Sequence, residues 1–130
     1  MTDTEQRPTG INLHSRSRQL ALAYGSGESY SLSCEYLRVY SPSAEVRGHG
    51  PGQEVLQTGK AKVNIKSIKP VGHYALQLVF DDGHDTGLYS WSYLYELCIN
   101  QEAWWQSYLD KLAAAGETRD PDVQVIQFDP

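Results

Sequence analysis

A regular alternation of side chains near the middle of the sequence limits most strongly what this chain can fold into. Between residues 73 and 80, large apolar side chains stand at every second position, as Tyr74, Leu76, Leu78 and Phe80. Successive side chains of a strand point to opposite faces of a sheet, so this spacing predicts a strand with one buried face. Asp81-Asp82-Gly83 then predicts a tight turn.

The spacing of the apolar side chains becomes helical after Ser90. Trp91, Leu94, Tyr95 and Cys98 stand at i, i+3, i+4 and i+7, which predicts an amphipathic helix with Ser90 as its N-cap. A second helical stripe follows and ends at Gly116, with Trp105, Tyr108, Leu109 and Leu112.

The first half of the chain predicts short strands around one short helix. Period-two alternation marks residues 11–13, 20–24, 30–32 and the start of a strand at 63–65. Ser33 can cap a helix that must end before Pro42, and residues 48–59 predict a loop. We therefore expect an α+β fold: a bent antiparallel sheet of about five or six strands, a short inserted helix and two C-terminal helices. Leu88 and Leu109 are expected in its core.

The length of the chain predicts one domain. Its 130 residues suffice for a single core. Residues 1–10 are expected to form a disordered leader, residues 11–116 the domain, and residues 117–130 a flexible acidic tail.

Composition argues against several classes of function. A net charge of −5 leaves no overall basic surface for nucleic acid. Apolar runs are too short to span a membrane, and residues 1–10 contain no secretory signal. Cys34 and Cys98 make no disulfide framework, so we expect a cytoplasmic protein.

The sequence does not predict an enzyme. Each histidine lacks the His-x-Asp or His-x-Glu pattern with which the iron site of 2-oxoglutarate oxygenases usually begins, and no nucleophile elbow is present. The carboxylates of Asp81, Asp82 and Asp85 are crowded into one segment, but such clusters are more often ordinary turn chemistry.

Two motifs resemble those of a known family. Residues 80–91 read FDDGHDTGLYSW, residues 35–46 read EYLRVYSPSAEV, and Gly48-His49-Gly50 follows the second of these. Together they resemble bacterial stand-alone members of a domain-of-unknown-function family, which is named for its similarity to the N-terminal domain of γ-butyrobetaine hydroxylase.

The resemblance implies a zinc site that this chain has largely lost. In the hydroxylase domain, three cysteines and one histidine hold zinc, and the corresponding positions here are Ser41, Ser43, Val46 and His84. Hydroxyls and a valine are poor zinc ligands, so we expect no cofactor. We expect His84 instead to hydrogen-bond Ser41 or Ser43, with Val46 filling the remaining space. The alternative is zinc or iron in a rearranged site around His84 and His49.

The resemblance also implies an accessory role. Related domains are fused to the hydroxylase and to P-loop ATPases that carry or assemble iron–sulfur clusters. We therefore expect a non-catalytic domain that binds a protein partner, whose identity the sequence does not give. The residues expected to contact the partner are Trp104, Lys60, Lys62 and Lys66, the lysines because they share strand parity.

Overall fold

The strands and helices follow the predicted order, but the strands form two sheets. The structure is a computed structural model that describes residues 7–123. One antiparallel sheet contains β1 (Pro8–His14), β2 (Gln19–Tyr24) and β3 (Ser29–Ser33). The other contains β4 (Ile65–Val71), β5 (Ala75–Phe80) and β6 (Leu88–Ser90), also antiparallel.

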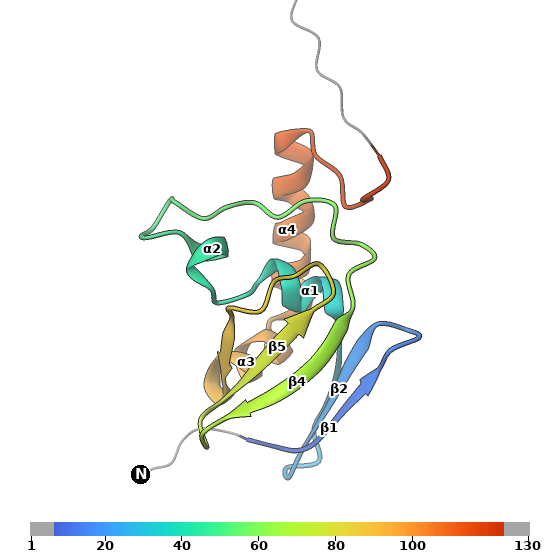
Figure 1. Ribbon diagram of the computed structural model, residues 1–130, viewed down its shortest axis with the longest axis vertical. Coiled ribbons are helices and arrows are strands. Elements are labelled where there is room, and N and C mark those ends of the chain that lie inside the picture. The colour runs from blue at the N-terminus through green and yellow to red at the C-terminus, as the bar shows by residue number, and fades with distance from the viewer. Residues whose placement is uncertain (1–6, 124–130) are drawn as a thin grey trace, which may run out of the picture.

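The α+β class is thus confirmed, whereas the prediction of one sheet with five or six strands is wrong. β3 runs directly into α1 (Cys34–Val39), so the chain leaves the first sheet through a helix. Figure 1 shows the β4–β5 hairpin beside the β1–β2 hairpin, with the helices on one side of the strands. Alternation reports which face of a strand is buried, but it does not report which strand is the pairing partner.

Local capping sets the helix boundaries. Ser33 Oγ accepts a hydrogen bond from the Tyr36 N–H at 3.0 Å, and Ser90 Oγ accepts one from the Tyr93 N–H at 3.2 Å. These serines begin α1 and α3 (Trp91–Ile99), as predicted. A further short helix, α2 (Ala44–Arg47), is capped by Ser43. Helix α4 (Gln101–Ala115) ends at Gly116, whose φ of 68° is left-handed.

The main core lies between the two sheets, α1 and α3, with a smaller cluster under α4. The expected core position of Leu88 is wrong, because its side chain is 47% exposed and that of Tyr89 is fully buried. Tyr89 pairs with Leu76 in the β5–β6 ladder, so Tyr89 lies on the buried face of the sheet. Leu88 is the adjacent residue along the strand and therefore points to the exposed face. Leu109 is only partly buried, in the smaller cluster with Val39, Tyr108 and Leu112.

Both expected domain edges differ from the structure. Strand β1 begins at Pro8, inside the expected leader, because it pairs with β2 up to Tyr24. At the other end, the backbone oxygens of Thr118 and Arg119 accept hydrogen bonds from Gly59 and Ala61, each at 2.9 Å. The beginning of the expected tail is therefore attached to the domain, and residues 124–130 lie outside the described part.

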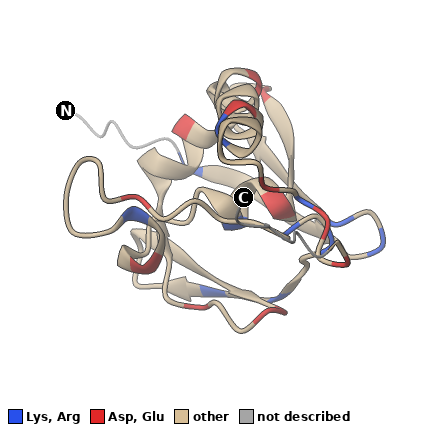
Figure 2. Ribbon diagram, turned by 90° about the horizontal axis from the view of Figure 1, so that it is seen from above, with Lys and Arg blue, Asp and Glu red and all other residues tan. Residues whose placement is uncertain are grey.

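Acidic and basic residues lie near one another in the part of the chain that the structure describes. Figure 2 shows Lys and Arg interspersed with Asp and Glu rather than gathered on one face. Within residues 7–123, no helix is both long and apolar enough to cross a membrane.

Candidate functional site

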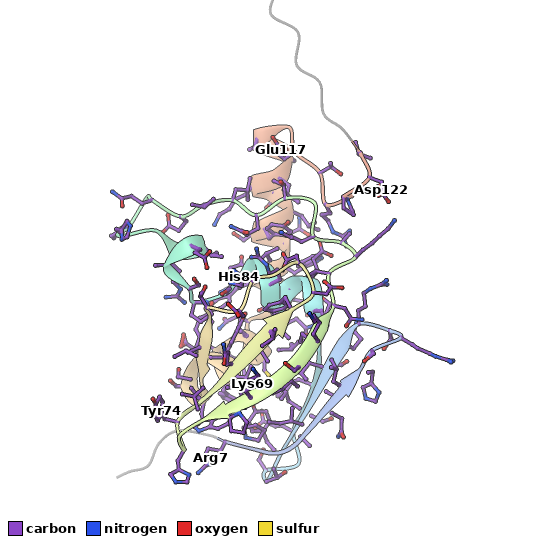
Figure 3. The ribbon with its side chains drawn as sticks, viewed as in Figure 1. Arg7, Lys69, Tyr74, His84, Glu117 and Asp122 are labelled. Carbon is purple, nitrogen blue, oxygen red and sulfur yellow. The ribbon has the colours of Figure 1, made fainter. Side chains whose placement is uncertain are left out.

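A buried polar cluster occupies the positions that the resemblance assigned to zinc. His84 Nε2 lies 2.8 Å from Ser41 Oγ, so the expected hydrogen bond forms. Ser43 Oγ lies 2.7 Å from Thr86 Oγ1, and Val46 is buried nearby in α2. Figure 3 shows His84 in the interior, between the strands and the helices. These contacts connect the α1–α2 corner to the segment that precedes β6.

The electrostatics of the cluster favour a neutral imidazole. Burial lowers the pKa of His84, and the nearby Arg38 guanidinium lowers it further, although Glu45 opposes both. The pKa of Asp82 is also lowered, and for a carboxyl group this favours the charged form. Burial raises it, but hydrogen bonds from Lys60 (2.6 Å), the His84 N–H (3.2 Å) and Arg38 (2.9 Å) lower it to about 2. The charged network therefore consists of Asp82 with its two cations, and His84 stays uncharged at neutral pH.

The order of hydroxyl, imidazole and carboxylate resembles a hydrolase triad, but the geometry does not suit one. Ser41 is fully buried, so its Oγ has no surface exposed to a substrate carbonyl. His84 Nδ1 lies 3.7 Å from Glu45 Oε1, which is longer than a hydrogen bond. The cluster is therefore best explained as packing with satisfied polar groups.

The residues of the cluster do not fit a metal. In the part of the chain that the structure describes, no group of three or more His, Cys, Asp or Glu side chains converges on a possible ion position. His49 is exposed in the loop after α2. Within residues 7–123, no hydrogen bond or ion pair connects His49 with His84. One imidazole beside hydroxyl oxygens is a weak donor set for zinc or iron.

We expect the protein to bind zinc only weakly. After purification without an affinity tag, incubation with equimolar zinc and dialysis, it should retain far less than one equivalent of metal. The physical reason is the absence of thiolates at Ser41, Ser43 and Val46. Elemental analysis by mass spectrometry measures this directly. The His84→Gln variant is the control, since its metal content should equal that of the parent. Stoichiometric zinc that disappears in this variant would refute the expectation.

The three predicted partner-binding lysines do not share a strand face. Lys60 and Lys62 precede β4, which begins only at Ile65. Lys60 pairs with Asp82 and Lys62 with Asp122, so both have internal partners. Lys66 lies on β4 and is exposed. The strand parity assumed for these lysines therefore does not hold.

Trp104, by contrast, lies in the wall of a groove of about 890 Å³. The groove separates α4 from the end of α1, α2 and the loop that follows α2. Four aromatic side chains line it, from α3, α4 and the C-cap of α1: Tyr40, Tyr93, Trp104 and Tyr108. An opening of this size with mostly apolar walls has the character of a binding site.

Hydrogen bonds hold the aromatic side chains of the groove in place. The Tyr40 hydroxyl donates to the Trp104 carbonyl at 2.6 Å, and the two rings stack with centroids 5.4 Å apart. The Tyr93 hydroxyl donates to the Tyr40 carbonyl at 2.6 Å. The Tyr108 hydroxyl donates to the Gln57 carbonyl at 2.7 Å, which fixes the loop against α4. The groove is therefore preformed and does not depend on a ligand for its order.

Among these residues, the sequence predicts only Trp104 as a partner contact. Tyr40 appears in the sequence only as part of the motif of residues 35–46, and no pattern distinguishes Tyr93. Arg47, whose guanidinium lies 4.7 Å from the centre of the Tyr93 ring, was also missed. The motif of residues 35–46 contains Tyr40 and ends beside Arg47, and this was the available signal. The motif does not indicate that residues of α3 and α4 face Tyr40 and Arg47 across the groove.

This arrangement defines a small α+β domain with a preformed aromatic groove and a buried polar cluster where a zinc site would stand. The chain matches the family described as gamma-butyrobetaine hydroxylase-like, N-terminal, over residues 11–95, and it belongs to that family.

Solved structures agree with this assignment. Two NMR solution structures are similar to the chain at 51% and 50% identity, with TM-scores of 0.81 and 0.77. The first alignment covers 95% of this chain and 98% of the other, and the second covers 100% and 99%. A crystal structure from Acidithiobacillus ferrooxidans, a protein of unknown function in the DUF971 family, is 36% identical with a TM-score of 0.61. That alignment covers 74% of this chain and 97% of the other. Among curated proteins, none matches.

Proposed function

We propose that this chain is a non-catalytic accessory domain that binds a protein partner through the aromatic groove. The preformed set of Tyr40, Tyr93 and Trp104 is the observation that carries the proposal. Tyrosine and tryptophan are enriched in protein interfaces, and side chains already held in place lose little entropy on binding. The buried hydroxyl–imidazole cluster supports the non-catalytic part, because its serine is inaccessible.

Two buried free cysteines support a cytoplasmic location for this role. Cys34 and Cys98 are both unpaired and packed in the core. Burial raises the pKa of the Cys98 thiol to about 11, so it is protonated and a poor nucleophile. Unpaired cysteines of this kind are typical of reducing compartments.

The alternative, a metal-binding domain centred on His84 and His49, has less support. It requires the neutral, hydrogen-bonded imidazole of His84 to exchange Ser41 for an ion. His49 would also have to leave the exposed rim of the groove.

The Trp104→Ala variant is expected to lose the partner in a co-purification from the native host, because it removes one wall of the groove. Tyr74→Ala is the matched control. Tyr74 is 58% exposed on the β4–β5 turn, which Figure 3 shows at the end of the molecule opposite to Glu117. Quantitative mass spectrometry of the recovered proteins compares the two variants with the parent. If both variants recover the partner protein equally well, the proposal that the partner binds in the groove is contradicted.

A further inference from the structure

We infer that the segment bound in the groove is an extended peptide in which an apolar side chain is flanked by carboxylates. This inference rests on the proposed function and specifies its partner. Three observations support it: the aromatic floor, the charge of the rim and the free backbone of the loop that forms one wall.

The floor of the groove selects an apolar side chain. Tyr40 and Trp104 stack at 5.4 Å, and Tyr93 lies beside Trp104 with ring centroids 6.4 Å apart. Val55 and Leu56 line the groove from the loop, and Val55 is 53% exposed. An apolar side chain of the partner placed here would remove the surface of Val55 and of the rings from water, which favours binding.

The rim of the groove selects negative charge. Arg47 and Lys111 lie on opposite sides, on α2 and α4, and neither makes an ion pair with a described residue. Glu54 is the single carboxylate among the described lining residues. The groove lining thus contains more Lys and Arg than Asp and Glu, whereas the whole chain carries a net charge of −5. Charge complementarity of this kind steers an acidic partner to the site.

The backbone of the loop suits an extended partner. Residues 53–58 have no regular secondary structure. The Val55 N–H donates to the Val46 carbonyl at 2.7 Å, which fixes the loop on one side. The flanking N–H groups of Glu54 and Leu56 donate to no residue within 7–123. In an extended chain the N–H groups of Glu54 and Leu56 point to the side opposite to the Val55 N–H. The carbonyl groups of an added peptide strand could therefore accept hydrogen bonds from them.

The experiment uses an array of short random synthetic peptides, incubated with the labelled full chain. Peptides that bind are expected to carry Asp or Glu on either side of Leu, Ile, Phe or Trp. The strongest is then resynthesised and its Kd measured by calorimetry. Trp104→Ala and the double variant Arg47→Glu, Lys111→Glu are each expected to weaken binding at least about tenfold.

The matched control reverses two other exposed charges, Arg16→Glu with Lys69→Glu, between β1 and β2 and on β4, and neither residue lines the groove. It should leave the Kd unchanged, and thermal unfolding checks that every variant is folded. Binding of neutral or basic peptides that still requires Trp104 would overturn the acidic partner and leave the proposed function standing. If no bound peptide depends on Trp104, the proposed function and this inference both fail.

Discussion

Replacing Arg119 by methionine is expected to lower the free energy of unfolding by about 2–3 kcal/mol. Arg119 makes two hydrogen bonds to the Glu35 carboxylate, from Nε at 2.8 Å and from Nη2 at 2.7 Å. The Glu35 side chain is 5% exposed, so without the guanidinium a buried charge loses its counter-ion. Arg119 itself is 44% exposed, and water can partly replace it, which places the effect below that of a fully buried pair.

Urea unfolding monitored by tryptophan fluorescence measures this loss. Lys62→Met is the matched control, because it removes an ion pair of the same terminal segment in which both partners are exposed. It should change stability little. Adding Glu35→Gln to Arg119→Met should recover part of the loss, since it removes the orphaned charge. A double variant that is less stable than Arg119→Met would contradict this explanation.

This ion pair illustrates what the sequence could not predict. Glu35 has a sufficient local explanation in the first turn of α1, where the helix dipole favours a carboxylate. Arg119 lies in an acidic segment beside Pro121, which indicates a tail. Their contact spans 84 positions, and no periodicity reports a contact at that range.

Local properties, in contrast, were predicted well. Ser33, Ser90 and Gly116 mark helix ends because capping depends only on neighbouring residues. The pairing of six strands into two sheets depends on distant partners, and here the prediction of one sheet was wrong. The contact of His84 with Ser41 was predicted only because the family resemblance brought both positions to one site.

The aromatic groove shows the same limit. Only parts of its walls are visible in the sequence, as the helical stripe that contains Tyr108 and the Gly-rich loop of residues 48–59. The stacking of Tyr40 on Trp104 joins α1 to α4 across 64 positions, so the groove exists only in the folded chain. The sequence could therefore indicate that Trp104 was available, but not what surrounds it.

The second large effect is expected at Gly87, where alanine should lower the free energy of unfolding by about 1–3 kcal/mol. A Cβ on Gly87 would overlap Ser41 Oγ and would lie 3.3 Å from Pro42 Cδ and 3.4 Å from Tyr89 Cε1. Ser41 cannot move aside easily, because it is fully buried and hydrogen-bonded to His84. The added methyl group therefore pushes apart the two segments that form the polar cluster.

Gly10→Ala is the matched control for this substitution. Its Cβ would meet only the Cβ of Ala23 at 3.7 Å, an ordinary contact, so stability should change little. Combining Gly87→Ala with Ser41→Ala removes the overlapping oxygen, and the double variant should lose less stability than the sum of the two single changes. Strict additivity in chemical unfolding would mean that Gly87 does not act through Ser41. Non-additivity would instead show that packing at Gly87 and the Ser41–His84 hydrogen bond stabilise one shared structure at the position where the resemblance had placed a metal.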